Sequence, residues 1–281
     1  MSGGKSIGFG DDILVSAIVR KAHLKHGKPV CVGDGRDIRV GDTATDTGIG
    51  QVFRNNPRIA LEIYPGAVWV QNIMGQRPYI DYLRTTPEKV VYNQMFHVEP
   101  GELYLTDDEK AKYAPLGDFI YIEPNTKGTF GGNKDWGFEK WAEVAKLDLP
   151  FVQGSGRKLD GVQQVHTETF RDACSLLHRA AFFVGTDGGL HHAAAALGKR
   201  AVVVWGGLVS PKLLGYASHL NLHSGTHSCG TTTPCKHCRQ ALDWVTVDMV
   251  CGAITDLYEQ SQAGLLQQGP SPALASMERA L

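Results

Sequence analysis

The segment from Phe182 to Gly198 constrains the fold of this chain more than any other part of its sequence. It consists of a short apolar run, the turn Gly185-Thr186-Asp187-Gly188-Gly189, and a run of alanines after His191 and His192. This order predicts a buried strand, a tight turn and a helix that packs closely on a sheet, with Gly198 as its C-terminal cap. The free amide groups and the helix dipole at such a turn suit a phosphate or diphosphate. A strand–helix turn without any ligand is the alternative.

Apolar runs alternate with amphipathic segments on both sides of this turn, which predicts an α/β fold with parallel sheets covered on both faces by helices. We place a first domain at residues 1–105, a second at 106–260 and a loosely packed tail at 261–281. The expected strands are 28–32, 67–70, 89–92, 119–122, 151–152, 181–184 and 201–205. The expected helices are 11–19, 136–146, 170–180 and 191–197.

Composition excludes several classes of protein. Of the 281 residues, 42% are hydrophobic and the net charge is −1, so the bulk of the chain is not expected to be disordered. The near-neutral charge disfavours a nucleic-acid partner. We expect no transmembrane segment, because no apolar run approaches the roughly 20 residues that a membrane span needs. The first residues, MSGGKSIGFGDD, lack the apolar centre of a signal peptide, so we expect a cytoplasmic protein whose six cysteines are reduced, buried or bound to metal.

Three motifs resemble glycosyltransferase family nine, the heptosyltransferase-like enzymes of lipopolysaccharide synthesis. Residues 185–198, followed by Trp205-Gly206-Gly207, resemble the donor-site signature of that family. Asn133-Lys134-Asp135-Trp136 is similar to its Lys-x-Trp segment, and Gly8-Phe9-Gly10-Asp11 to its N-terminal Gly-x-Gly-Asp. The resemblance implies the GT-B architecture, in which two Rossmann-like domains face each other across a cleft. The C-terminal domain would bind a nucleotide sugar, and the N-terminal domain, reduced in this chain, would bind the acceptor.

The resemblance also implies roles for single residues. Asp11 would be the base that takes the proton of the acceptor hydroxyl, with Asp12 beside it as a rival and an ordinary helix cap as the alternative. Lys134 would contact the donor phosphates, whose negative charge grows as the leaving group departs. The other donor-site candidates are the amides of Gly188, Gly189 and Leu190 and the side chains of Asp187, His192, Thr129 and Ser155.

The chain departs from the family pattern at two places in the donor site. Gly188 stands where the family usually has Ser or Thr, which removes one hydroxyl contact. The loop Gly154-Ser155-Gly156-Arg157 lacks the acidic residue that often holds the donor ribose. Both departures bear on the donor and acceptor more than on the fold.

These observations predict an inverting, metal-independent glycosyltransferase that moves a sugar from a nucleotide-diphosphate sugar to an acceptor hydroxyl of a glycan or lipopolysaccharide type. No cofactor is expected to be required for catalysis. One alternative is a glycosyltransferase that acts on a modified nucleic-acid base. Another is a protein that binds a nucleotide sugar without turning it over, in which a carboxylate facing the donor would have no use.

Four of the cysteines form a second cluster in the sequence. Cys229, Cys235, Cys238 and Cys251 have the spacing C-x5-C-x2-C-x12-C, which is compatible with a structural zinc ion. Reduced, partly buried thiols in a loop are the alternative. The other two cysteines, Cys31 and Cys174, fall on a predicted strand and a predicted helix and are expected in the core.

Overall fold

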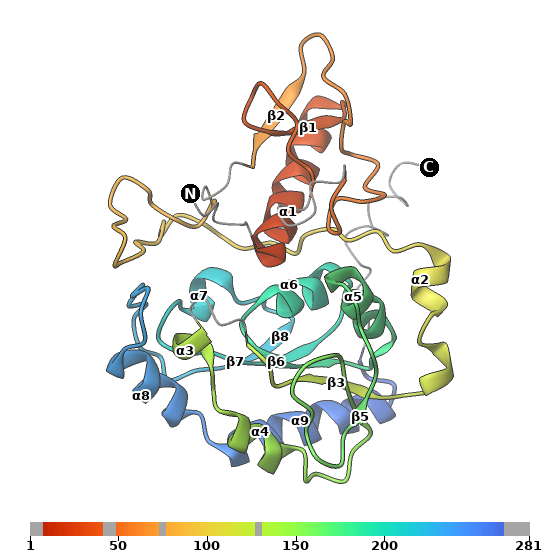
Figure 1. Cartoon of the computed structure of the whole chain (residues 1–281), viewed down its shortest axis with the longest axis vertical. Helices are drawn as coiled ribbons and strands as arrows, with labels where there is room; N and C mark the ends of the chain where they lie inside the picture. Colours follow the sequence, from red (N-terminus) through yellow and green to blue (C-terminus); the bar gives the residue numbers. More distant parts are fainter. Residues whose placement is uncertain (1–7, 42–48, 73–76, 127–130, 267–281) are drawn as a thin grey trace.

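The computed structural model describes residues 8–41, 49–72, 77–126 and 131–266. Two α/β units are stacked on each other, a small N-terminal unit at the top of Figure 1 and a larger unit with the main sheet below it. Every pair of named strands is parallel. The predicted α/β class, with parallel sheets and a reduced N-terminal unit, is therefore confirmed.

The N-terminal unit consists of one long helix and two short strands. Helix α1 (Phe9–His26) starts after Gly8 and ends at Gly27, whose φ of 62° is the left-handed conformation that glycine adopts without strain. Strand β1 (Val30–Gly33) is fully buried and pairs in parallel with β2 (Val68–Gln71). A sheet of two strands is too small to enclose a core of its own.

The predicted strand at residues 89–92 is wrong. Lys89 forms an isolated antiparallel bridge with Thr231 of the larger unit, and Tyr92 forms one with Ile80. The two ends of the segment therefore pair with different partners, so no continuous ladder develops.

The larger unit holds a six-stranded sheet in the order β5-β4-β3-β6-β7-β8. Its strands are β3 (Ile120–Glu123), β4 (Phe151–Gln153), β5 (Gln163–Gln164), β6 (Phe183–Thr186), β7 (Ala201–Val204) and β8 (His219–Leu222). Counted from β3, this is the 3-2-1-4-5-6 order of the doubly wound fold. The strand order reverses between β3 and β6, and in such sheets ligands bind outside the carboxyl ends of the strands at this point.

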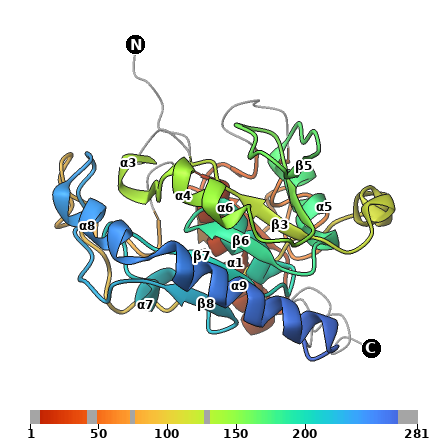
Figure 2. The same cartoon turned by 90° about the horizontal axis from the view of Figure 1, so that it is seen from below.

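Helices cover both faces of this sheet (Figures 1 and 2). The face toward α1 carries α5 (Phe170–Arg179), α6 (Gly189–Ala196) and α7 (Pro211–Leu214). The opposite face carries α4 (Phe138–Val144) and α9 (Val247–Gln262), with α3 (Gly131–Lys134) and α8 (Lys236–Trp244) near one end. None of the helices in the described ranges has the length and hydropathy that a membrane span requires.

Two further stretches concern the predicted domain boundaries. The chain passes between the units in an extended stretch and then forms α2 (Asp107–Ala111) and a short 3-10 helix (Ala114–Leu116). The boundary at 105/106 lies in that stretch and stays a prediction. Helix α9 continues to Gln262, so the first two residues of the predicted tail are helical, and residues 267–281 lie outside the described residues.

Candidate active site

The loops that follow β3 and β6 bring two predicted donor-site residues together at the reversal of strand order. Lys134 ends α3, and Asp187 follows β6 directly. The Lys134 ammonium lies 2.5 Å from Asp187 Oδ2. The carboxylate is almost completely buried, whereas about a quarter of the lysine side chain is exposed. A cation that a ligand can reach therefore stands where this fold type binds ligands.

The turn between Asp187 and α6 is fixed by His191. The Gly188 amide donates to His191 Nδ1 over 2.8 Å, so the ring proton is on Nε2, which lies 3.2 Å from the Leu214 carbonyl oxygen that accepts it. Burial lowers the pKa of His191 to about 3, so the ring is neutral. Because the Gly188 amide is used within the turn, Gly189 and Leu190 are the predicted amide donors that this bond does not occupy.

His192 lies in the contact between α6 and α1. Its Nδ1 is 2.7 Å from the Tyr216 hydroxyl, its side chain is buried, and burial lowers its pKa well below the usual value. A Cβ atom placed on Gly10 would lie 2.8 Å from His192 Cδ2 and 3.3 Å from Gly189 Cα. The first turn of α1 and the first turn of α6 therefore touch.

This contact places Asp11 at the border between the two units. Next to it, the rings of Phe9 and Phe170 stack with their centroids 4.5 Å apart. The Asp11 carboxylate accepts a hydrogen bond from the Gly8 amide, which is the helix-cap role named above as the alternative. It also contacts Arg77 and Tyr79, two residues that the sequence analysis missed. No local pattern signals them, since Tyr79 is separated from Asp11 by 68 positions.

Two donor-site candidates remain, Thr129 and Ser155. Thr129 lies outside the described residues. The Ser155 hydroxyl donates to the Thr167 carbonyl oxygen over 2.9 Å and lies 3.3 Å from His166 Nδ1. Ser155 therefore stabilises the turn after β4, and none of these contacts reaches Lys134.

Glu123, at the carboxyl end of β3, is a third residue that the sequence analysis missed. It accepts hydrogen bonds of 2.9 Å from both nitrogens of Asn125, and burial raises its pKa. Asn125 in turn accepts a hydrogen bond of 3.0 Å from the Arg157 amide. A carboxyl group thus stands beside the loop 154–157, which has no acidic residue of its own.

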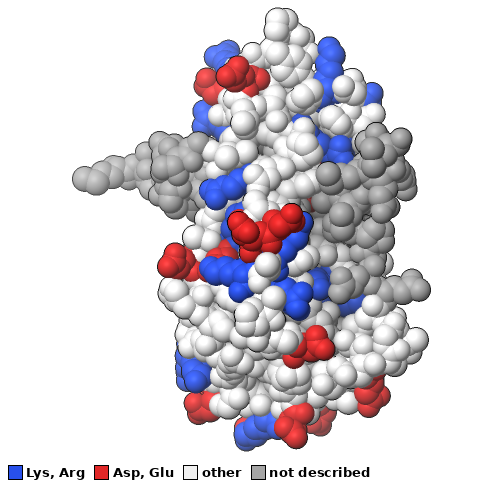
Figure 3. Space-filling model, turned by 90° about the vertical axis from the view of Figure 1, so that its right-hand side faces the viewer, with Lys and Arg blue, Asp and Glu red and all other residues white. Residues whose placement is uncertain are grey.

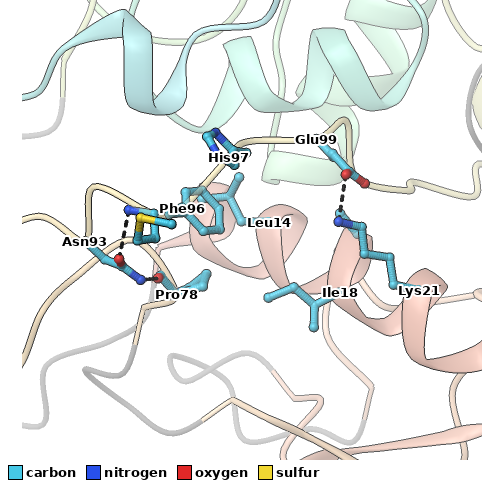
Figure 4. Close-up of a pocket in the computed structure, with 10 residues that line it drawn as sticks. Leu14, Ile18, Lys21, Pro78, Asn93, Phe96, His97 and Glu99 are labelled. Carbon is cyan, nitrogen blue, oxygen red and sulfur yellow. Dashed lines mark hydrogen bonds and ion pairs between the residues drawn. The ribbon is translucent and has the colours of Figure 1, made fainter.

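The N-terminal unit contains a cavity of about 320 Å³ between α1 and residues 93–99. Leu14 and Ile18 of α1 and Phe96 line it, and Figure 4 shows the ion pair between Lys21 and Glu99 at one end. That pair is 2.6 Å long. The cavity is mainly apolar and lies on the side of the molecule expected to hold the acceptor.

Three of the four predicted metal-binding cysteines come together. The sulfur of Cys229 lies 3.2 Å from that of Cys238 and 3.9 Å from that of Cys235, and all three lie within 4.8 Å of one another. In a tetrahedral zinc site with Zn–S bonds of about 2.3 Å, sulfur atoms are about 3.8 Å apart, so these three fit. Cys251 lies on α9 and is not part of this group.

The cysteine loop also connects the two units. Its Gly230 carbonyl accepts a hydrogen bond of 2.8 Å from the Val90 amide, and its Thr232 amide donates to Glu88 over 3.0 Å. On the other side, the Cys235 amide donates over 3.0 Å to Asn133, the neighbour of Lys134. The loop therefore holds both a segment of the N-terminal unit and the loop that carries the donor-site lysine.

Comparison with protein families supports the resemblance. A model of glycosyltransferase family 9 (heptosyltransferase) matches residues 167–244. The predicted family resemblance is therefore confirmed. The matched stretch includes Asp187 to His192 and the three clustered cysteines, whereas Asp11 and Lys134 lie outside it. None of the curated proteins compared with this chain matches it.

Several solved structures are similar to this one. Heptosyltransferase II of E. coli, which acts with ADP-heptose by its description, is 20% identical, with a TM-score of 0.44 over 63% of this chain and 56% of that one. A family 9 glycosyltransferase of Veillonella parvula is 14% identical, with a TM-score of 0.45 over 58% and 55%. The iron-containing dodecameric glycosyltransferase TibC of E. coli is 15% identical, with a TM-score of 0.44 over 59% and 52%. This chain thus matches about half the length of each.

Proposed function

We propose that this protein is an inverting glycosyltransferase that moves a sugar from a nucleotide-diphosphate sugar to an acceptor hydroxyl. One observation carries the proposal: Asp11, on the N-terminal unit, follows Gly10, which touches the first turn of α6, and the turn before α6 carries Asp187, the partner of Lys134. A cation for the leaving diphosphate and a base for the incoming hydroxyl are the two groups that a sugar transfer needs.

On the donor side, Lys134 supplies the positive charge. In the absence of a donor it is paired with Asp187, and a diphosphate would take the place of that carboxylate as its partner. The amides of Gly189 and Leu190 would add two donors at the start of α6. These groups stabilise the charge that develops on the departing diphosphate, so the reaction we propose proceeds without a catalytic metal.

On the acceptor side, Asp11 takes the proton of the hydroxyl as its oxygen attacks the anomeric carbon. The bond from that carbon to the diphosphate oxygen breaks in the same step, and the nucleoside diphosphate leaves with the bonding electrons. Attack from the side opposite to the leaving group inverts the anomeric configuration. The apolar cavity beside α1 favours a glycan or other acceptor that carries an apolar portion.

The nucleic-acid alternative is disfavoured by charge. On the face of the molecule in Figure 3, Lys and Arg side chains are interspersed with Asp and Glu side chains around the middle. The net charge of the chain is −1. A phosphate backbone is bound by a surface of one sign, which this face does not present.

Donor binding is tested by thermal unfolding with ADP-, UDP-, GDP- and CMP-sugars, with ADP-heptose first. A ligand at a hundred times its Kd adds about 2.7 kcal/mol to stability, which raises the melting temperature measurably. We expect one nucleotide family to stabilise the protein and Lys134→Met to weaken its binding about 10- to 100-fold. Lys146→Met, a lysine that pairs with Glu143 on the surface, is the control. No shift with any nucleotide sugar would refute the proposal.

Turnover separates an enzyme from a non-catalytic binder. Asp11→Asn should lower the release of nucleoside diphosphate about 10²- to 10⁴-fold while the affinity for the donor is kept. Asp12→Asn, which removes the neighbouring carboxylate, should have a much smaller effect. If the Asp12 variant is inactive and the Asp11 variant is active, the base is Asp12. If neither variant changes a measurable release, no base acts from this helix.

We also propose that Cys229, Cys235 and Cys238 hold a structural zinc ion. Three thiolates are a donor set typical of zinc, and the loop they close contacts both units. Metal analysis of the purified protein should give one zinc per chain. Iron is measured as well, because TibC is described as iron-containing. Cys238→Ser should lose the metal and Cys251→Ser should keep it; loss in the second variant would make Cys251 the fourth ligand.

A further inference from the structure

The Asp11 carboxylate is held by more partners than a helix cap requires. Its Oδ2 accepts a hydrogen bond of 3.2 Å from the Gly8 amide and lies 2.7 Å from Arg77 Nε. Its Oδ1 accepts a hydrogen bond of 2.7 Å from the Tyr79 hydroxyl. The side chain of Asp11 is only 12% exposed. A cap of α1 needs the Gly8 contact alone, so the other two contacts call for a different explanation.

These contacts use the two oxygens unequally. A carboxylate oxygen has about two acceptor positions. Among the residues that the structure describes, Oδ2 contacts both the Gly8 amide and the Arg77 guanidinium, whereas Oδ1 contacts the Tyr79 hydroxyl and keeps one acceptor position. A hydroxyl that gives its proton to Asp11 must approach an oxygen with a free position.

We propose that Tyr79 and Arg77 are positioning residues for the base, and that they direct Oδ1 of Asp11 toward the acceptor hydroxyl. This inference rests on the proposed function, since it concerns the same proton transfer. During the transfer the acceptor proton moves to Oδ1. Tyr79 keeps its own proton and remains a donor to that oxygen, and Arg77 stays charged beside Oδ2.

The protonation states of both partners fit this role. Burial, with the neighbouring Asp11 charge as a second cause, raises the pKa of Tyr79 well above its usual value, so its hydroxyl donates across the working pH range. Desolvation acts to lower the pKa of Arg77, but the contacts with Asp11, Tyr79 and Tyr82 together outweigh it, so the pKa of Arg77 is raised. Tyr79 therefore stays protonated and Arg77 stays charged while the proton is transferred.

The segment that carries both residues is itself held in place. The Asn93 amide donates to the Tyr79 carbonyl oxygen over 2.8 Å, and the Asn93 side chain reaches the Pro78 carbonyl oxygen, as Figure 4 shows. The Tyr79 ring lies between those of Tyr92 and Phe96 at centroid distances of 6.4 and 6.1 Å. A tyrosine that only filled space would not need this fixed orientation of its hydroxyl.

The same packing connects the base to the donor unit. The Tyr92 hydroxyl donates over 2.9 Å to the Leu208 carbonyl oxygen, in the loop that follows β7. Tyr92 therefore spans from the larger unit to the ring that orients Asp11. The base is thus positioned by contacts from both units rather than by α1 alone.

The test is the pH dependence of nucleoside diphosphate release, with water as the acceptor where no other is known. In Tyr79→Phe the carboxylate loses one donor, so the acid limb of kcat/KM should move up by about one pH unit. We also expect kcat to fall about tenfold, with the KM for the donor unchanged. Arg77→Met should move the limb in the same direction, and Arg77→Lys should restore most of the shift.

Tyr64→Phe is the matched control. The Tyr64 hydroxyl donates to the Pro29 carbonyl oxygen in the same unit, and this variant should leave the acid limb in place. Melting temperatures check that each variant is folded. An unchanged acid limb in folded Tyr79→Phe and Arg77→Met, with Asp11→Asn inactive, would overturn the positioning role and leave the base intact. An active Asp11→Asn would instead refute the base itself.

Discussion

The two units of this molecule differ in how their cores are built. One hydrophobic cluster lies between the sheet and the α4–α9 side, and all its buried members come from residues 120–257 of the larger unit. The buried residues of the N-terminal unit, such as Ile13 and Val32, belong to a second cluster that also contains Leu176, Ala193 and Val203 of the larger unit. The larger unit thus has a core of its own, whereas the N-terminal unit shares its core with its neighbour. The position of Asp11 therefore depends on the contact between the units.

The largest expected effect comes from breaking that contact at Arg171. This arginine of α5 is 3% exposed, forms an ion pair with Glu109 and donates to the carbonyl oxygens of Tyr104 and Gln51. Because Glu109 is partly exposed, Arg171→Met should cost near the lower end of about 3–5 kcal/mol in the free energy of unfolding. Urea unfolding measures this loss.

The comparison of the two units also predicts which strands lose stability in Arg171→Met. Hydrogen exchange should accelerate in β1 and β2 of the N-terminal unit, while the strands β6 and β7 keep their protection. Lys112→Met, which removes a half-exposed lysine that pairs with Asp172 of α5, should cost less than about 1 kcal/mol. If exchange in Arg171→Met accelerated equally in both units, the N-terminal unit would be as independent as its neighbour.

This difference also explains how much could be predicted from the sequence. The strand, turn and helix around Asp187 were predicted because the contact that closes the turn is local: the Gly188 amide bonds His191, three positions away. Lys134 and Asp187 were both expected in the donor site, and they meet because β3 and β6 are adjacent in the parallel sheet. By contrast, Arg77 and Tyr79 follow no periodic pattern, and the partner of Lys89 is in the other unit. Long-range contacts of this kind have no local signal.

Cys251 shows a related limit of sequence reasoning, because it was predicted as a metal ligand and is not part of the cysteine group. Its spacing from Cys238 fits a metal site. However, Cys238 lies on α8 and Cys251 on α9, where Cys251 packs against the core of the larger unit. Sequence spacing gives the length of the connection between two ligands and not its direction.

The second-largest effect is expected where the first turns of α1 and α6 touch. Gly10 is helical, so replacement by alanine should by propensity alone stabilise α1 by up to about 1 kcal/mol. The added Cβ would lie 2.8 Å from His192 Cδ2 and 3.3 Å from the backbone of Gly189, and we expect the overlap to destabilise the protein by about 1–3 kcal/mol instead.

Gly252→Ala is the control for Gly10→Ala. Gly252 lies in α9, and a Cβ atom there would meet nothing within 4 Å. This variant should be slightly more stable than the unmodified protein, by helix propensity. Thermal unfolding of both variants gives the sign of each effect. Equal stabilisation by the two substitutions would mean that the helix starts do not press on each other.

The smallest expected effect is a pH dependence that belongs to the larger unit. Burial lowers the pKa of His191 to about 3, below its value of about 6.5 in the unfolded chain. The unfolded state therefore binds a proton first as the pH falls, so the stability contributed by neutral His191 is complete above pH 6.5 and is lost between pH 6.5 and 3. Between pH 7.5 and 5.5 this amounts to about 1.4 kcal/mol.

His191→Gln should flatten the pH dependence of the unfolding free energy by that amount, whatever its effect at pH 7.5. His26→Gln, on an exposed site of α1, should leave the slope unchanged. An unchanged slope in His191→Gln would mean that the ring is protonated equally in both states, and the neutral tautomer that fixes the Gly188 turn would have to be abandoned.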